Sequence, residues 1–173
     1  MSSPSPYPEA LQKLIIENDA KFPDVEHMSA ADALALSKTT LPPIFVDCRT
    51  PAEQSISTIP YSIPYDIFSP STATSSKIIL YCTIGYRSSL NAQNLKKKHP
   101  NLQISNLSGS VLSWSHTSGP FVNPQGEPTK RLHVYGNDWD LAASDIHTIK
   151  FGFWSSIVEG FWEVTRIIKM KIT

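Results

Sequence analysis

The chain has 173 residues, of which 40% are hydrophobic, and its 15 lysines and arginines balance its 15 aspartates and glutamates. This length and composition indicate one globular domain with extensions. The balanced charge argues against nucleic-acid binding, which needs a basic surface. The one basic cluster, Lys96 to His99, falls late in an expected helix, where cations suit the helix dipole, so we interpret it as a solvated helix end.

The N-terminal residues and the two cysteines bear on the cellular compartment of the protein. The first residues, MSSPSPYPEALQKLI, lack the basic and apolar regions of a secretory signal, and no apolar run is long enough to cross a bilayer. The two cysteines, Cys48 and Cys82, are too few for a secreted disulfide framework and show no metal-ligand spacing. We therefore expect a cytoplasmic protein with reduced thiols and no metal site.

Pattern alone predicts the elements of the first half of the chain. In chain order these are a Ser/Pro-rich tail over 1–8, a helix over Glu9–Asn18, a strand near Val25–His27, a helix capped by Ser29 and ending at Leu36, and a strand over Ile44–Asp47. The stretch SISTIPYSIPYDI follows, and we expect it to be irregular because Pro60 and Pro64 oppose a regular element.

The second half begins with a polar loop, SPSTATSS, and then the most strongly apolar strand, KIILYC. We expect a helix over Ser88–Lys98, with Leu90, Ala92 and Leu95 facing inward, and a short strand within LQISNL. Strands that alternate with helices indicate a parallel or mostly parallel sheet that is covered on both faces.

After Trp114 the sequence changes character. The segment HTSGPFVNPQGEPTKRLHVYGNDWD is rich in glycine, proline and other turn residues, so we expect a long irregular excursion over the surface. The last segment, FGFWSSIVEGFWEVTRIIKMKI, predicts an amphipathic helix with a broad apolar face. The apolar positions at helical spacing are Phe153, Ile157, Phe161, Val164 and Ile168.

The apolar face of this last helix needs a partner, because large apolar patches seldom stay exposed. We expect it to pack on the protein itself, within one chain or across a homodimer. A membrane surface is the alternative. Flanking lysines would suit anionic lipid, whereas Glu159 and Glu163 on the polar side oppose lipid binding.

The loop CTIGYRSS joins the strand KIILYC to the helix over Ser88–Lys98. In parallel sheets, ligands bind beyond the carboxyl ends of strands, and both Cys48 and Cys82 fall at such ends. Backbone N–H groups and the positive helix end should acidify the Cys82 thiol, Gly85 allows the bend, and Arg87 adds a permanent charge. Such a pocket would stabilise a thiolate, an oxyanion or a persulfide sulfur. The alternative is a buried structural cysteine.

Three ordered blocks, between about Val25 and about Val122, share one pattern. They are IFVDCRTPAEQSISTIPYSI, IILYCTIGYRSSLNAQNL and ISNLSGSVLSWSHTSGPFV. Together they resemble the rhodanese, or sulfurtransferase, family, whose active-site strand, loop and helix are similar to the second block. The matching positions outside that loop are Asp47, Arg49, Glu53, Ile59, Pro60, Leu107, Gly109, Trp114, Gly119 and Pro120.

Four positions depart from the family pattern, all outside the cysteine loop. Thr58 stands where the family usually has His, and Ser57 and Tyr61 stand where it usually has Gly. Ser110 replaces the second Gly of the usual Gly-Gly pair.

The resemblance implies an α/β fold of the rhodanese type. The expected architecture is a mostly parallel five-stranded sheet with helices on both faces, followed here by the amphipathic C-terminal helix. The chain then divides into a tail and short helix over 1–24, a rhodanese-like domain over 25–122, and an irregular segment with the C-terminal helix over 123–173.

The resemblance also implies a sulfurtransferase or persulfide carrier with Cys82 as the nucleophile. Cys82 would take the outer sulfur of a small donor such as thiosulfate, hold it as a persulfide and pass it to a thiol or to cyanide, without a cofactor. Arg87 would attract the anionic donor. Asp47, Arg49 and Glu53 would be scaffold, with an Arg49–Glu53 ion pair beside the loop. The backbone amides that would hold the sulfur belong to Thr83, Ile84, Gly85, Tyr86 and Ser88.

Alternative functions stay open on the sequence. A cysteine-dependent phosphatase or arsenate reductase of the related cell-cycle phosphatase type would use a loop one residue longer. The four residues between Cys82 and Arg87 favour the smaller sulfur pocket. A non-enzymatic interaction module would need neither residue. A disulfide between Cys48 and Cys82, whose strands are neighbours in such sheets, is a further alternative that a reducing cytosol disfavours.

The five histidines are scattered along the chain, and no pair has the spacing of metal ligands on a helix face. We interpret them as surface or packing residues. If the stretch RLHVYG folds back, His133 and Tyr135 would close over the pocket of Cys82.

Overall fold

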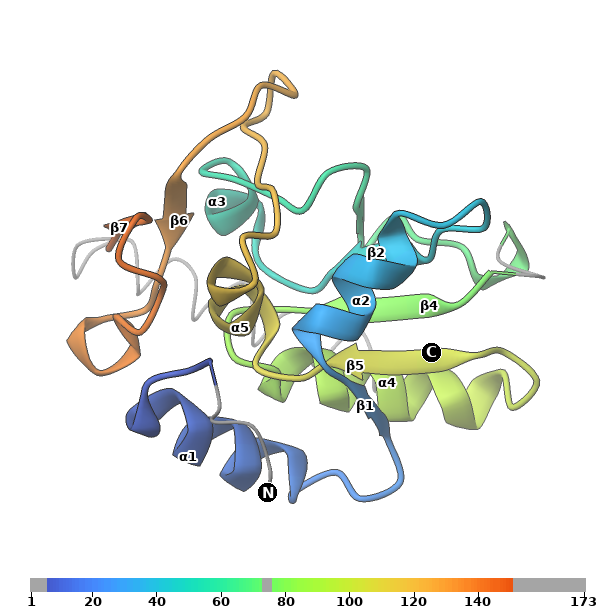
Figure 1. The fold of residues 1–173 in the computed structure, drawn as a ribbon. Coiled ribbons are helices and arrows are strands. Elements are labelled where there is room, and N and C mark those ends of the chain that lie inside the picture. The colour runs from blue at the N-terminus through green and yellow to red at the C-terminus, as the bar shows by residue number, and fades with distance from the viewer. Residues whose placement is uncertain (1–5, 73–75, 151–173) are drawn as a thin grey trace.

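The computed structural model describes residues 6–72 and 76–150 of the chain. The amphipathic helix expected from Phe153 onward lies outside the described residues, and so its packing stays a prediction. Figure 1 shows a central sheet with helices around it and a small second sheet at one side.

Five parallel strands form the central sheet: β1 (Glu26–Met28), β2 (Ile44–Asp47), β3 (Ile63–Pro64), β4 (Ile78–Tyr81) and β5 (Ile104–Leu107). Their order is β1-β5-β4-β2-β3, and each neighbouring pair runs parallel. The predicted strand over Ile44–Asp47 has the observed bounds. The expected parallel α/β sheet is therefore confirmed.

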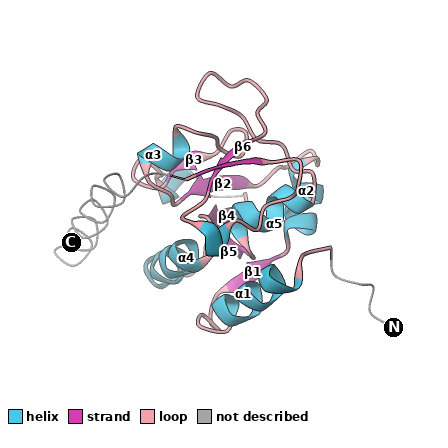
Figure 2. Ribbon diagram, turned by 90° about the vertical axis from the view of Figure 1, so that its left-hand side faces the viewer, coloured by secondary structure: helices cyan, strands magenta, loops and turns pink. Residues whose placement is uncertain are grey.

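Helices cover both faces of this sheet. The described residues form α1 (Glu9–Asp19), α2 (Ala30–Ser37), α3 (Pro51–Gln54), the 3-10 helix η1 (Pro70–Thr72), α4 (Tyr86–Lys98) and α5 (Ser110–His116). Figure 2 shows α4 on one side of the sheet and α2 and α5 on the other. The predicted cap of α2 is also confirmed, because the Ser29 hydroxyl accepts a hydrogen bond from the Asp32 N–H.

Alternate residues of the central strands point to opposite faces, so each face has its own core. Beneath α4, Val46, Ile78 and Leu80 pack with Ala92 and Leu95. Ala92 and Leu95, which belong to α4, were predicted to face inward. The strand β4 is buried on both faces, as its unbroken apolar run predicts.

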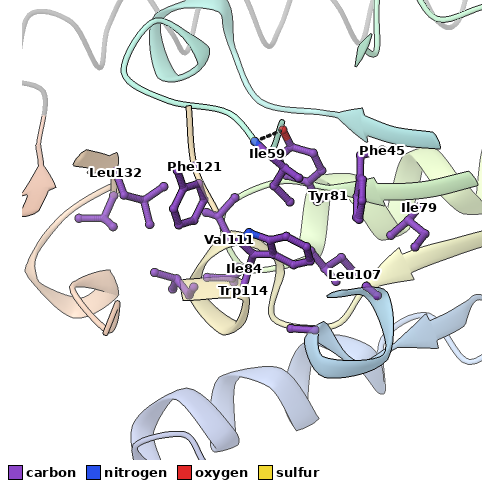
Figure 3. Close-up of a cluster of buried hydrophobic side chains, with 14 of the residues drawn as sticks. Phe45, Ile59, Ile79, Tyr81, Ile84, Leu107, Val111, Trp114, Phe121 and Leu132 are labelled. Carbon is purple, nitrogen blue, oxygen red and sulfur yellow. Dashed lines mark hydrogen bonds between the residues drawn. The ribbon is translucent and has the colours of Figure 1, made fainter. Parts of the chain in front are cut away.

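The second core lies between the sheet and the helices α2 and α5 (Figure 3). At its centre the Phe45 ring packs edge-on against Trp114, with ring centroids 5.4 Å apart. Phe121 and Leu132, which follow α5 in the chain, complete this cluster. The core thus includes residues from well beyond the last helix of the central domain.

The segment beyond α5 is not wholly the irregular excursion that we expected. It holds a two-stranded parallel sheet of β6 (Arg131–His133) and β7 (His147–Ile149), with the 3-10 helix η2 (Asn137–Trp139) between them. Leu132 and Val134 are fully buried in the second core. The short apolar alternation was hidden among glycines and prolines. We name residues 123–150 the C-terminal extension.

Two local expectations are wrong, and one confirmed helix starts earlier than predicted. The strand β3 includes Pro64, which is tolerated because an edge strand does not need every N–H for pairing. The helix α4 begins at Tyr86, two residues before the predicted start at Ser88. Leu90, predicted to face inward, is 37% exposed.

The Tyr81 hydroxyl, at the end of β4, is a fully buried polar group. It lies 2.7 Å from Asp47 Oδ2 and 2.8 Å from Ser62 Oγ, and it accepts a hydrogen bond from the Ile59 N–H at 3.2 Å (Figure 3). Burial, and then the Asp47 carboxylate, raises the pKa of this hydroxyl well above its usual value. The hydroxyl therefore ties β4 to β2 and to the loop that leads into β3.

Tyr81→Phe should lower the free energy of unfolding by about 1–3 kcal/mol, because it leaves buried polar groups of Asp47 and Ile59 without this partner. Urea unfolding followed by circular dichroism measures the change. Tyr61→Phe is the matched control, because Tyr61 is fully exposed, and its effect should stay below about 0.5 kcal/mol. Equal effects of the two substitutions would contradict this role of the buried hydroxyl.

Candidate active site

Both cysteines lie at the carboxyl edge of the sheet, as predicted. Cys82 follows β4 at the start of the loop to α4, and Cys48 follows the neighbouring strand β2. Both thiols are buried, and no disulfide joins them. Because ligands of parallel sheets bind at this edge, the loop of Cys82 is the candidate active site.

The Cys82 sulfur lies among hydrogen-bond donors. The Gly85 N–H donates to Sγ at 3.2 Å, and the Ser88 hydroxyl lies 3.5 Å from it. That hydroxyl also lies 2.6 Å from Asn106 Oδ1, while the Cys82 N–H donates to the Ser110 hydroxyl at 3.0 Å. Sequence reasoning did not identify Asn106 or Ser110 as site residues. A polar residue within the buried strand β5 was the available signal for Asn106.

The pKa of the Cys82 thiol is lower than that of an ordinary cysteine. Burial alone would raise it, but the charge of Arg87, the Ser88 hydroxyl and the Ser88 and Gly85 amides together outweigh burial. The thiolate is the nucleophilic form, so a larger fraction of Cys82 is reactive near neutral pH.

Gly85 gives the loop its shape. Its φ of +113° lies in the left-handed region, which residues with a Cβ seldom adopt. A Cβ at this position would lie 3.0 Å from Asn18 Nδ2 and 3.3 Å from Asn106 Nδ2. Asn18, buried near the end of α1, donates to the Ile84 carbonyl at 3.2 Å. The N-terminal helix therefore supports the loop directly.

The residues predicted to hold sulfur through their amides occupy different places. The Gly85 and Ser88 amides face the Cys82 sulfur. The Thr83 hydroxyl instead binds a neighbouring carboxylate at 3.1 Å, and Ile84 is buried. The Tyr86 ring is 48% exposed. Sulfur binding by the Thr83, Ile84 and Tyr86 amides stays a prediction.

Arg87 forms a bidentate ion pair with Glu53. Its Nη1 donates to Oε2 and its Nη2 to Oε1, both at 2.8 Å. The Arg87 side chain is 14% exposed, and that of Glu53 is fully buried. Burial would lower the pKa of Arg87, but the bond and charge of Glu53 hold it well above its usual value. The guanidinium therefore keeps its charge, which Glu53 partly balances.

The predicted Arg49–Glu53 ion pair is wrong. Arg49 binds Asp47 through Nε at 3.0 Å and Nη2 at 2.7 Å, and it binds the Ser57 carbonyl at 2.6 Å. Glu53 faces elsewhere because it closes the capping box of α3, in which the Thr50 N–H donates to Oε2 at 2.9 Å. The capping geometry leaves the carboxylate directed at the cysteine loop.

The C-terminal extension folds back onto the Glu53–Arg87 pair. His133 Nδ1 lies 3.6 Å from Glu53 Oε1, and the Tyr135 hydroxyl donates to Oε2 at 3.3 Å. The Tyr135 ring covers Arg87, with Cζ 5.1 Å from the ring centroid. Figure 1 shows β6 beside α3, which carries Glu53. The stretch RLHVYG does fold back, and His133 and Tyr135 reach the site as expected in that case.

Glu53 is ionised although it is fully buried. Burial would raise its pKa, but the neighbouring imidazole of His133, followed by the bonds and charge of Arg87, holds it well below the usual value. Glu53 is therefore not a proton donor near neutral pH.

Within residues 6–72 and 76–150, no group of His, Cys, Asp or Glu is arranged to hold a metal ion. In the same part of the chain, no helix has the length and apolar character to cross a membrane. His27 binds Asp19 at 3.1 Å, and His116 lies 2.8 Å from the Leu141 carbonyl.

Glu53→Gln should lower the free energy of unfolding at pH 7 by about 3–5 kcal/mol, because Arg87 loses its charged partner. The folded-state pKa of Glu53 lies below the usual 4.5, so the contribution of the carboxylate is present above that pH and is lost as the pH falls through the folded pKa. The difference between the variant and the unchanged protein should therefore shrink in acid.

Urea unfolding at pH 7 and at several acidic pH values measures this difference. Asp145→Asn is the control, because Asp145 forms an exposed ion pair and its loss should change stability little. A Glu53→Gln effect that stays constant from neutral pH into acid would contradict the ionised state of Glu53.

The family model of the rhodanese-like domain matches residues 29–117, which is more than half of the 173-residue chain. Among solved structures, a Rhodopseudomonas palustris protein of unknown function, described as a possible tyrosine phosphatase, is 24% identical. That match covers 70% of this chain and 100% of the relative, with a TM-score of 0.50.

A thiosulfate sulfurtransferase from Pseudomonas aeruginosa is 15% identical, over 68% of this chain and 23% of its own length, with a TM-score of 0.56. No curated protein gave a match. The sequence resemblance and the parallel sheet thus agree with the family model, and the chain belongs to the rhodanese-like domain family.

Proposed function

We propose that the chain is a sulfurtransferase or persulfide carrier that works through Cys82. The observation that supports this most directly is the position of the Cys82 sulfur, 3.2 Å from the Gly85 amide in a loop with four residues between Cys82 and Arg87. A thiolate among such donors is nucleophilic, and the same donors suit the negative charge of a persulfide sulfur.

The proposed reaction has two displacements at sulfur. The Cys82 thiolate attacks the outer sulfur of thiosulfate, the S–S bond of the donor breaks, and sulfite leaves with the electron pair. Cys82 then carries a persulfide. An acceptor thiolate, or cyanide, attacks the outer sulfur, and Cys82 leaves as a thiolate, which regenerates the starting state.

Arg87 acts on this chemistry mainly through its field at Cys82. Its charge lowers the pKa of the thiol, whereas both terminal nitrogens are bound to Glu53. The guanidinium is thus held in place beside the loop and is not free to wrap around an anion. That Arg87 also attracts an anionic donor is a separate and more specific part of the proposal.

A phosphatase is the second candidate, because the Rhodopseudomonas relative is described as a possible tyrosine phosphatase. Phosphate transfer from an ester needs a general acid for the leaving group. Glu53, the carboxylate bound to Arg87, is ionised and buried, and so it does not supply that proton. The short loop and the state of Glu53 together favour sulfur transfer.

Incubation with thiosulfate or with a low-molecular-weight persulfide should add one sulfur atom at Cys82, because its thiolate is stabilised in the loop. Intact mass measured without reductant detects the added sulfur. Cys48→Ser should take up sulfur, and Cys82→Ser should not. The proposal fails if neither donor adds sulfur at Cys82. Turnover of a generic aryl phosphate that depends on Cys82 would instead support the phosphatase.

Arg87→Ala should slow sulfur uptake from thiosulfate by on the order of 10²-fold, because it removes the charge that stabilises the Cys82 thiolate. Arg87→Lys keeps a charge but not the bidentate fork, so its rate of sulfur uptake should lie between those of Arg87→Ala and the unchanged protein. Quenched time courses read by intact mass give the rates, and circular dichroism verifies folding. A loss in Cys48→Ser as large as that in Arg87→Ala would show that the pocket is misassigned.

A further inference from the structure

The C-terminal extension lies outside the span of the family model, which ends at residue 117. It nevertheless supplies two side chains to the candidate active site. Leu132 and Val134 are buried in the second core, whereas His133 and Tyr135, the residues that alternate with them, contact Glu53. The alternation that begins in β6 and continues through Tyr135 therefore places one pair in the core and the other pair at the site.

His133 and Tyr135 are themselves held in place. The His133 side chain is 2% exposed, and its ring packs edge-on against Tyr135 with centroids 5.5 Å apart. On the other side, Trp139 packs edge-on against Tyr135 at 6.0 Å. A ring fixed by two neighbours keeps a defined position over Arg87.

The two residues act on the same ion pair from different directions. A buried carboxylate needs several donors to stay ionised, and the central domain supplies Thr50, Thr83 and Arg87 to Glu53. From the extension, the Tyr135 hydroxyl adds a further donor, and the His133 imidazole packs beside the carboxylate with Nδ1 3.6 Å from Oε1. The Tyr135 ring also shields the guanidinium of Arg87 from water, and this strengthens the ion pair.

We propose that His133 and Tyr135 are positioning residues of the active site, which hold Glu53 and Arg87 in the arrangement that supports the reactivity of the Cys82 thiol. The extension is then part of the catalytic unit. The effect on persulfide formation rests on the proposed function, whereas the effect on the thiol does not. The charged and titratable groups that act on the Glu53–Arg87 pair are Arg49, Cys82, His133 and Tyr135.

The test uses the full chain with Cys48→Ser, so that Cys82 is the one thiol whose reactivity is measured. His133→Leu removes the polar imidazole beside Glu53, and His133→Asn keeps a polar nitrogen near the place of Nδ1. Tyr135→Leu removes the ring and the hydroxyl, and Tyr135→Phe removes the hydroxyl alone. The matched controls are His147→Asn, at an exposed position of β7, and Tyr61→Phe, at a fully exposed tyrosine.

Alkylation of Cys82 by iodoacetamide, followed by intact mass across a range of pH, gives the thiolate titration without any sulfur donor. Both Leu variants should shift the midpoint to higher pH and slow alkylation at pH 7 by about three- to tenfold. His133→Asn should restore most of the rate, Tyr135→Phe should slow it by about twofold, and both controls should match the unchanged protein.

A lower melting temperature with an unmoved midpoint would show a merely structural role and overturn the proposal. If the Leu variants do not fold, Tyr135→Phe decides the question, because it keeps the packing, and a midpoint equal to that of Tyr61→Phe would overturn it. Sulfur uptake is measured separately. Failure of all variants and the unchanged protein to take up sulfur would reject the proposed function but leave the alkylation result standing.

Discussion

The site depends on one buried negative charge, the carboxylate of Glu53. A charge without solvent contact must be matched by donors, and Glu53 collects them from four places in the chain: its own helix cap, the cysteine loop, the start of α4 and the C-terminal extension. The carboxylate fixes Arg87, and the charge of Arg87 is one of the groups that lower the pKa of Cys82, together with Ser88 and Gly85. Distant segments of the chain therefore meet at one ionised group.

The sequence predicted well those features that are encoded locally. The apolar runs of β2 and β4, the Ser29 cap of α2 and the glycine-containing loop after Cys82 each have a signal within a few residues. Parallel pairing followed from the alternation of strands and helices, and it placed both cysteines at one edge of the sheet. The cysteine loop of the candidate active site could thus be found before the fold was known.

The remaining features depend on long-range contacts, which no local pattern carries. Glu53 and Arg87 are 34 residues apart, and Asn18 reaches the Ile84 carbonyl across 66 residues. The short spacing of Arg49 and Glu53 suggested a pair, but the capping box turned the carboxylate away from Arg49. The strand β6 was too short and too closely bounded by turn residues to be distinguished from a loop.

Ser110 departs from the family pattern, and this serine adds backbone strain but also gains a hydrogen bond. It occupies a φ of +48°, where a residue with a Cβ is strained by roughly 1–2 kcal/mol and a glycine is not. In return its hydroxyl accepts the hydrogen bond of the Cys82 N–H, a gain of about 1 kcal/mol. These magnitudes nearly cancel, so the serine is close to neutral for folding. The serine therefore supplies an acceptor for the Cys82 amide at the candidate active site, which a glycine at this position would lack.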